Sequence, residues 1–351
     1  MLNTTINGTS TICFPDSNFA KALYITKIIW NFCGLFCVMI GLPGHVFQGI
    51  IMLNRINRKQ ATSFYFVAIA VYEFFYLIGV LWMRLVSMSF IRFDPRLVFS
   101  CGFFYTMISG PTIASNLLLA SLTTDRSLMI LYPTRYRLLM TRHHVFKRIS
   151  LVTLIVVLIM IPPYFSLSYD PNLHNYFLCK LRPSFRRWET NLWPLIHTIL
   201  FAFVPSLMTC ISSIILLRDR FRHRRVHKRT LSIRSRRMQT LSLLIALFSL
   251  ISLVSILPVG IVEVIIFNDH IVNQKSSCSM RRIRYKILLN CFLSFMSMNY
   301  SLKFYVRLII STPFRRDFLR LIGCDSGARQ LNTRSSRHEK RLHSPSFLHQ
   351  K

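Results

Sequence analysis

The sequence predicts an all-α membrane protein, a seven-transmembrane helix bundle with an extracellular N-terminus and a short amphipathic eighth helix. Three observations lead to this fold class: long apolar runs, a large excess of basic residues, and charges that concentrate between the runs. Of 351 residues, 52% are hydrophobic and only 16% are charged, with a mean hydropathy of +0.41. A soluble domain needs roughly a quarter of its residues charged to solvate its surface. These values therefore exclude an ordinary soluble domain.

The charge balance narrows the class further. The chain has 44 Lys and Arg against 12 Asp and Glu, a formal net charge of +32. A soluble nucleic-acid-binding domain would explain the charge but not the apolar runs, so we expect no nucleic-acid partner. Disorder is excluded because the apolar content is too high. A polytopic protein whose charges lie outside the lipid bilayer accounts for both properties.

Seven apolar segments are each long enough to cross about 30 Å of hydrocarbon at about 1.5 Å per residue. We expect helices near residues 23–53, 63–90, 101–131, 146–168, 192–217, 239–267 and 285–310. Several of these segments contain proline, which packed membrane helices accommodate as kinks.

The basic residues give the orientation. They cluster after the first, third, fifth and seventh spans, and residues 218–237 alone hold ten Lys or Arg against Asp219. The positive-inside rule makes this face cytoplasmic and places the N-terminus outside. The Asn-x-Thr acceptor sites at Asn3 and Asn7 agree, because glycosylation takes place in the secretory lumen. The outer connection 269–286 is also basic, which indicates either headgroup contact or attraction of an anionic ligand.

The predicted organisation follows from these spans. Residues 1–22 form a glycosylated extracellular tail, 23–311 the seven-helix domain, 312–324 a juxtamembrane eighth helix, and 325–351 a cytoplasmic tail that we expect to be disordered. Cys324, just after the eighth helix, is a palmitoylation candidate. We expect a multi-pass protein of the plasma membrane.

Specific motifs add a family resemblance. Cys101 opens the third span, and Asp125-Arg126-Ser127 closes it. This pattern resembles the Asp-Arg-Tyr motif of rhodopsin-like (class A) G-protein-coupled receptors, with Ser127 in place of tyrosine. Glu73 stands in the second span where the family has aspartate. The nearest pattern is that of invertebrate neuropeptide receptors of the FMRFamide type.

The resemblance extends to two kink prolines, Pro205 in the fifth span and Pro258 in the sixth. In the seventh span, the family's Asn-Pro-x-x-Tyr motif can be aligned in two registers. One starts at Asn299-Tyr300. The other keeps the usual distance to the eighth helix and places the motif on residues 303–307, with Lys303 in the asparagine position. We prefer the second register.

Other switch positions depart from the family pattern. The aromatic toggle of the sixth span is Ile256, and the tyrosine of the fifth span corresponds to Ser213. Met238 stands where the family has an acidic partner for the motif arginine. The scaffold is thus clear, whereas the residues that switch it are altered.

The resemblance implies disulfides on the outer side. Cys101 should bond Cys179 in the second outer loop, and Cys13 could join Cys278 in the third. Free thiols are the alternative. Such a bridge restricts the unfolded chain and ties the loop to the mouth of the bundle.

By resemblance, Arg126 couples the receptor to a heterotrimeric G protein when the sixth helix swings outward. In the resting state we expect Asp125 to hold Arg126 as a charge-assisted pair. The alternative is an Asp-Arg pair that only snorkels at the membrane edge. Because Met238 is not acidic, we expect a weak resting lock and raised basal activity.

Glu73 and Lys303 occupy two positions that, in the family, line a sodium pocket together with a third-span serine, here Ser115. A lone charge near mid-membrane is expensive and normally faces a partner inside the bundle. The expectation is a Glu73–Lys303 ion pair in place of sodium. The alternative is that Lys303 and Arg307 snorkel to the cytoplasmic headgroups.

Candidates for the ligand pocket lie in the outer half of the spans. Ile108 stands where amine receptors have an aspartate, which disfavours an amine ligand. Arg84, His197 and Glu263 fall on positions that line peptide-receptor pockets, although each also fits an interface or core role. A peptide ligand is favoured.

Two functions remain open: a receptor that signals through G proteins, and a receptor-fold protein with degenerate switches that acts as a non-coupling binder or dimer partner. A transporter or channel would require internal repeats or unwound mid-membrane helices. The sequence has no repeated half, and its odd number of spans disfavours duplication. No nucleophile–base pair or metal-ligand set is evident, so we expect no enzyme activity, no metal and no cofactor.

Overall fold

The computed structural model of the chain describes residues 17–54, 57–88, 100–132, 134, 136, 140–169, 179–185, 192–226, 233–272 and 280–323. Five predicted sites lie outside these residues: the glycosylation sites Asn3 and Asn7, the cysteines Cys13 and Cys278, and the palmitoylation candidate Cys324. The predictions for them stay predictions.

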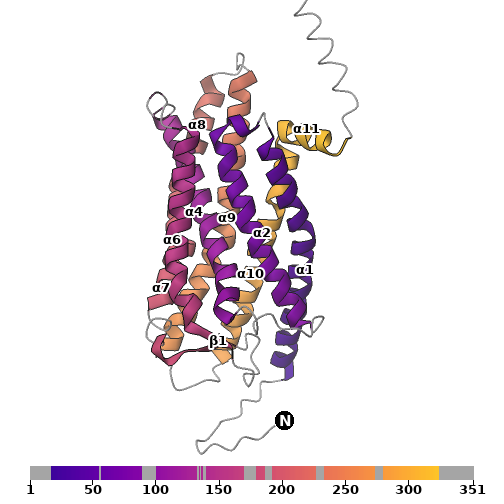
Figure 1. Cartoon of the computed structure of the whole chain (residues 1–351), viewed down its shortest axis with the longest axis vertical. Helices are drawn as coiled ribbons and strands as arrows, with labels where there is room; N and C mark the ends of the chain where they lie inside the picture. Colours follow the sequence, from indigo (N-terminus) through magenta and orange to yellow (C-terminus); the bar gives the residue numbers. More distant parts are fainter. Residues whose placement is uncertain are drawn as a thin grey trace, which may run out of the picture.

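In the described part of the chain, seven long helical segments run side by side along one axis (Figure 1). They are α1 (Ser17–Leu53), α2 (Ala61–Ser87), α4 (Cys101–Leu131), α6 (Arg142–Ser166), α8 (Val204–Val226), α9 (Ile233–Val272) and α10 (Met280–Ile310). The bounds of α4 are those expected from the sequence. α9 extends several residues beyond its predicted ends, because hydropathy marks the part of a helix that lies in lipid, while the helix itself continues into polar flanks.

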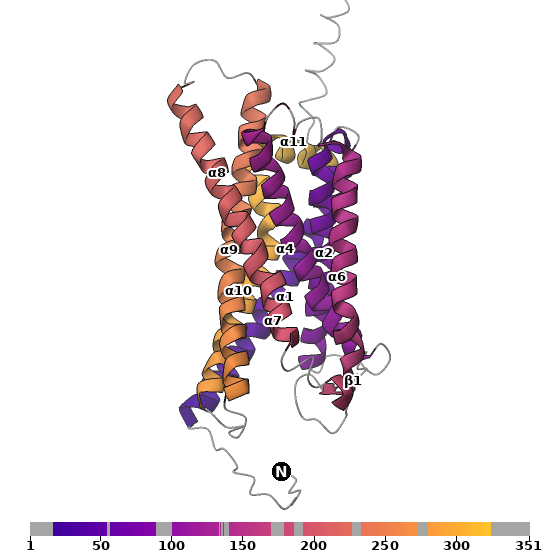
Figure 2. The same ribbon diagram turned by 90° about the vertical axis from the view of Figure 1, so that its left-hand side faces the viewer.

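The two ends of the bundle carry different elements. A short amphipathic helix, α11 (Thr312–Leu321), lies across the end where α8 stops and α9 starts (Figures 1 and 2). The strands β1 (Leu167–Tyr169) and β2 (Cys179–Leu181) pair antiparallel at the opposite end. We call the α11 end the inner end, since the basic connections that predict the cytoplasmic face lie there, and the other the outer end.

Polar side chains start the helices at both ends. The Ser100 hydroxyl accepts a hydrogen bond from the Phe103 amide at the start of α4, at 3.3 Å. At the inner end, Thr141 begins α6 in the same way, and Ser311 begins α11 with Pro313 in the first turn. These residues satisfy backbone donors that the first helical turn leaves unpaired. The described parts of the connections contain two single-turn 3₁₀ helices, η1 (Asn57–Lys59) and η2 (Pro183–Phe185).

The fifth span contains a change of helix type that the sequence did not indicate. α7 (Trp193–Thr198) continues into a π-helical turn, η4 (Ile199–Phe203), and then into α8, in which Pro205 is the second residue. Pro258, by contrast, lies inside the continuous helix α9. A single π turn changes which side chains face the bundle after it, and such turns are common at functional positions.

The apolar surface faces outward and polar groups face inward. In the middle of α6, the exposed side chains are aliphatic, among them Leu154, Val157, Leu158 and Ile161. Ser, Thr and Asn side chains are buried between the helices, such as Thr123, Asn116, Ser255 and Ser297. This distribution suits a bundle surrounded by lipid, where polar groups can be satisfied only inside the protein.

Six of the described helices are long and apolar enough to cross a membrane, judged by length and composition. They correspond to the first six predicted spans. The seventh, α10, has 31 residues but is less apolar, because its inner half carries Lys303 and Arg307 and several buried polar residues. Both cations are buried, with 5% and 3% of their surface exposed. They face the bundle, so α10 packs as its seventh member.

Candidate functional site

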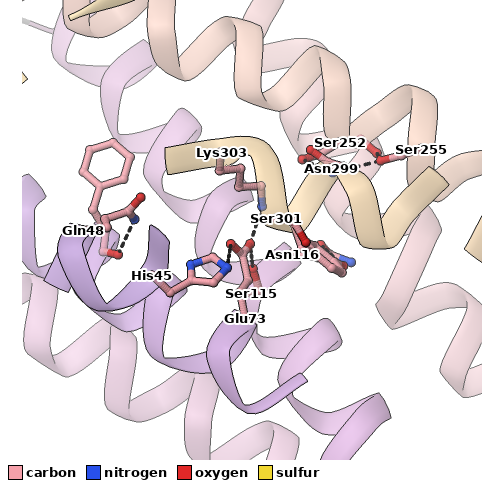
Figure 3. Close-up of polar contacts among 12 residues, drawn as sticks. His45, Gln48, Glu73, Ser115, Asn116, Ser252, Ser255, Asn299, Ser301 and Lys303 are labelled. Atoms are coloured by element: carbon pink, nitrogen blue, oxygen red, sulfur yellow. Dashed lines mark hydrogen bonds and ion pairs between the residues drawn. The ribbon is translucent and has the colours of Figure 1, made fainter. Parts of the chain in front are cut away.

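A carboxylate lies at the centre of the bundle. Glu73 of α2 is 1% exposed, and the Lys303 ammonium of α10 forms an ion pair with its Oε1. The Ser115 hydroxyl of α4 donates a hydrogen bond to the same oxygen at 2.6 Å. Figure 3 shows these side chains converging from three helices. The structure therefore brings together the three residues that the sequence singled out.

His45 is a fourth member of this cluster, which sequence reasoning missed. Its Nε2 atom lies 3.9 Å from Oε2 of Glu73, too far for a hydrogen bond but close enough for electrostatic attraction when the ring is protonated (Figure 3). Neither ring nitrogen has a hydrogen-bond partner among the described residues. A histidine inside the apolar run of α1 was the available signal.

The position of Lys303 bears on the register of the seventh span. Lys303 meets Glu73, as the preferred register requires, whereas Asn299 faces α9 and donates to Ser255 at 2.9 Å and Ser252 at 3.2 Å. Neither Lys303 nor Arg307 extends to the headgroups. The snorkelling alternative is wrong for both because they are enclosed by neighbouring helices.

A second polar link joins four helices. Pro205 has no N–H, so the carbonyl of Phe201, four residues earlier, lacks its ordinary helical donor. The Asn116 side chain of α4 donates to that carbonyl at 3.3 Å and accepts from the Tyr300 hydroxyl of α10 at 3.1 Å. The Tyr300 ring packs edge to face on Tyr76 of α2, with centroids 5.1 Å apart. The proline of the fifth span is thus compensated by a side chain from the third.

Asp125, at the inner end of α4, has partners that the sequence did not predict. It is fully buried, and Arg148 of α6 forms an ion pair with its carboxylate. The hydroxyls of Tyr65 and Tyr136 each donate to it at 2.8 Å. Arg148 also donates to the Tyr136 hydroxyl at 2.8 Å. Burial raises the pKa of Tyr136, which keeps its phenol protonated as the donor.

The expected resting pair between Asp125 and Arg126 is therefore wrong. Consecutive residues of a helix project about 100° apart, so Asp125 meets Arg148 of α6 and Tyr65 of α2, whereas Arg126 meets Thr62 at another position of α2. Arg126 is 5% exposed, and its Nη2 donates to the hydroxyl of Thr62. Its Nη1 lies 4.0 Å from the sulfur of Met129. Met238 belongs to α9, but its side chain is outside the described residues.

Arg307 lies one turn beyond Lys303 on α10, among aromatic rings. Its guanidinium carbon is 3.4 Å from the centroid of Phe66 of α2, and 5.4 Å from that of Phe314 of α11. A guanidinium stacks favourably on such faces. Its two terminal nitrogens have no hydrogen-bond partner in the described part of the chain.

At the outer end, the structure brings together two of the four candidate pocket residues. His197 of α7 lies 3.2 Å from a carboxylate oxygen of Glu263 on α9. The His197 ring stacks on Phe201, with centroids 5.2 Å apart. Next to it, the Trp193 indole donates to the Tyr105 hydroxyl at 2.7 Å. These contacts join the third, fifth and sixth spans.

The other two candidates lie elsewhere. Arg84 is buried against α1, where it donates to Asn31 at 3.2 Å and lies 3.8 Å from the centroid of the Trp30 ring. Ile108 packs against α2 so closely that a Cβ atom at Gly79 would come within 2.9 Å of it. Arg84 is thus a contact between helices and is not grouped with His197.

Cys101, the first residue of α4, is disulfide-bonded. The backbone of Cys179 begins β2 at the same end of the bundle, but its side chain is outside the described residues. The pairing of Cys101 with Cys179 stays a prediction. Cys33, Cys37, Cys210 and Cys291, all inside the helices, are free.

No group of three or more potential metal ligands occurs among the described residues. The site is therefore a set of buried polar contacts along the axis of a helical bundle, with a carboxylate at its centre and an arginine at its inner end. Such an arrangement can couple movements of helices rather than catalyse a reaction.

Comparison with known proteins agrees with this geometry. Residues 49–302 match the model of the family described as 7 transmembrane receptor (rhodopsin family), which is more than half of the chain. A search of curated proteins finds no significant match. Members of this family are receptors rather than enzymes, act through extracellular ligands and G proteins, and cross the membrane several times. The chain belongs to the rhodopsin-like family of G-protein-coupled receptors.

Proposed function

We propose that this receptor binds a peptide at its outer end and transmits binding to heterotrimeric G proteins through Arg126, as the inner end of α9 moves outward. The observation that carries this proposal is the state of Arg126. It lies at the inner end of α4 with one hydroxyl partner, and the neighbouring Asp125 is occupied by Arg148. Arg126 is buried in this structure, but no carboxylate holds it, so an outward movement of α9 could expose it to a cytosolic transducer.

The outer end supports a peptide ligand. His197 and Glu263 offer a basic and an acidic group within 3.2 Å of each other, beside the aromatic residues Trp193 and Tyr105. An imidazole, a carboxylate and large rings match the backbone and side chains of a peptide better than an aliphatic lipid. Ile108 supplies no carboxylate for an amine. An amidated peptide of the FMRFamide type is the specific candidate.

We further propose that the Glu73–Lys303 pair takes the place of the sodium ion in the family's central pocket. The ammonium of Lys303 occupies one oxygen of Glu73, and Ser115 donates to the same oxygen. A cation covalently attached to α10 removes the need for a free one. Signalling should therefore be insensitive to sodium concentration.

The second candidate function is a binder or dimer partner that does not couple. Ile256 at the aromatic toggle position and Ser213 at the tyrosine position of the fifth span favour it. Both residues are buried, at 3% and 7% exposure. Neither isoleucine nor serine has an aromatic ring that could change position between the helices. This alternative keeps the outer site and assigns no role to Arg126.

The two functions are separated by measuring G-protein dissociation in cells that express the receptor, first without ligand and then with a library of amidated peptides. We expect basal dissociation above that of mock-transfected cells and a further increase with an active peptide. Arg126→Gln should abolish both at equal surface expression. The matched control is Arg316→Gln, which changes an exposed arginine of α11.

A signal unchanged in Arg126→Gln would contradict the coupling role. Peptide binding with no dissociation from any G-protein class would establish the non-coupling alternative instead.

A further inference from the structure

Two buried arginines at the inner end have no anionic partner within the described residues. Arg126 is 5% exposed and Arg307 is 3% exposed. Three of their guanidinium nitrogens have no hydrogen-bond partner: Nε of Arg126 and both terminal nitrogens of Arg307. An isolated buried charge costs several kcal/mol unless it is paired and hydrogen-bonded.

The two guanidinium groups lie on the same stripe of α2. Arg126 donates to Thr62, and Arg307 stacks on Phe66, four residues further along that helix. Side chains four residues apart on a helix lie one above the other, with Cβ atoms about 5–6 Å apart. Both arginines therefore approach one region from opposite sides, Arg126 from α4 and Arg307 from α10.

Stacking satisfies the faces of the Arg307 guanidinium but not its edge. The Phe66 and Phe248 rings approach it at 3.4 Å and 6.0 Å. The N–H donors lie in the guanidinium plane, so rings that cover a face leave these donors unused. A planar fork of this kind matches the oxygens of a phosphate or carboxylate.

The chain itself has little acid to offer at this end. Of the described acidic residues there, Asp125 pairs with Arg148 and Asp317 accepts from Asn57 at 3.0 Å. Asp219 also has a partner of its own. The cytoplasmic side of the sequence is strongly basic, as part of a net charge of +32. Among the residues that the structure describes at this end, each carboxylate thus already has a partner, so we expect the anion that neutralises the two arginines to come from another molecule.

We infer that Arg126 and Arg307 form an intracellular binding site for a phosphate group, in which Arg307 supplies the bidentate fork. A phosphate dianion balances two guanidinium charges and has enough oxygens for all three unused donors. The source is either a soluble phosphate compound or the headgroup of a phosphoinositide in the inner leaflet. The site shares Arg126 with the proposed coupling role, but its test requires neither a peptide nor a G protein, so the two proposals can fail separately.

The test uses the full-length receptor in nanodiscs of phosphatidylcholine, and the readout is Tm. Inorganic phosphate and a soluble inositol phosphate are titrated at ionic strength matched with chloride. A second set of nanodiscs contains a phosphoinositide bisphosphate. A ligand that binds the folded protein alone raises Tm with concentration, so we expect a saturable increase.

Arg307→Gln should abolish the increase, while Arg316→Gln, on the exposed face of α11, should retain it. Arg307→Lys keeps the charge but loses the fork, and should weaken the apparent affinity about ten- to a hundredfold. This second variant provides the comparison if Arg307→Gln does not fold. An effect of the soluble compounds indicates a free phosphate ligand, and an effect confined to the second set of nanodiscs indicates the lipid headgroup.

Two results would overturn the inference. One is no change in Tm with any phosphate source. The other is an increase of equal size and equal concentration dependence in the wild type, Arg307→Lys and Arg316→Gln, which would mean that phosphate acts on the basic surface in general.

Discussion

Removing the ammonium of Lys303 tests the central ion pair directly. In Lys303→Met, the new side chain has a length similar to that of lysine and an apolar stem, but it carries no charge. Glu73 would remain 1% exposed, with the Ser115 hydroxyl as its hydrogen-bond donor and His45 at 3.9 Å. The variant therefore leaves a buried carboxylate with one neutral donor in place of a cation.

The size of the effect follows from this burial. Breaking a buried pair by removing one partner costs about 3–5 kcal/mol, whereas replacing both partners is often nearly neutral. A change of 1 kcal/mol shifts Tm by about 2–4 °C in proteins of 150–250 residues. Lys303→Met should thus lower Tm by about 6–20 °C. The double variant Glu73→Gln with Lys303→Met should recover most of that loss.

Thermal unfolding of the purified receptor in detergent, followed with a thiol-reactive dye, measures these differences. The matched control is Glu263→Gln, which breaks a pair that is 12% and 26% exposed. Partly solvated pairs contribute about 1 kcal/mol or less, so its Tm should change little. The charge exchange Glu73→Lys with Lys303→Glu should likewise fold better than Glu73→Lys alone.

The ion-pair argument fails if the double variant is no more stable than Lys303→Met. It also fails if Lys303→Met and Glu263→Gln lower Tm equally, since burial would then have no bearing on the cost.

Three further changes should lower Tm in the same assay. Arg148→Gln leaves the buried carboxylate of Asp125 with two phenol donors, and should lower the free energy of unfolding by about 1–3 kcal/mol. An unchanged Tm would mean that the ion pair is not formed in solution. Asn116→Ala removes the donor to the Phe201 carbonyl and should cost a similar amount, and a neutral result would show that water replaces the amide. Gly102→Ala forces a Cβ atom into the backbone of Tyr164 and should lower the free energy of unfolding by at least about 1–3 kcal/mol. Gly49→Ala is the control, because Gly49 has open space around it and the change should not lower Tm. Equal Tm values for the two variants would contradict the close approach at Gly102.

The sequence predicted the helices well where lipid is the solvent. The bounds 101–131 match α4, since an apolar run ends where the bilayer ends and Ser100 supplies a cap. Less visible were features without a hydropathy signal. The π turn Ile199–Phe203 and the antiparallel pairing of β1 with β2 depend on backbone hydrogen bonds. No pattern of residue types in the sequence indicates these bonds.

Among the site residues, prediction succeeded where a charge had to be neutralised inside the membrane. Glu73 and Lys303 are strongly disfavoured in lipid alone, so each one predicts the other. It failed for Asp125, whose partner is Arg148 rather than its neighbour in sequence. Arg148 belongs to the basic residues that follow the third span, and nothing in the sequence shows which of these points toward Asp125.

By itself, the sequence determined that this chain is a membrane-embedded helical bundle, because residue types state their preference between lipid and water. It also determined that the buried charges must find partners. Which partner each one finds was decided by the tertiary structure. The rotation of each helix about its axis selects the facing side chains, so that Asp125 meets Arg148, Arg126 meets Thr62, and Arg307 lies among aromatic rings.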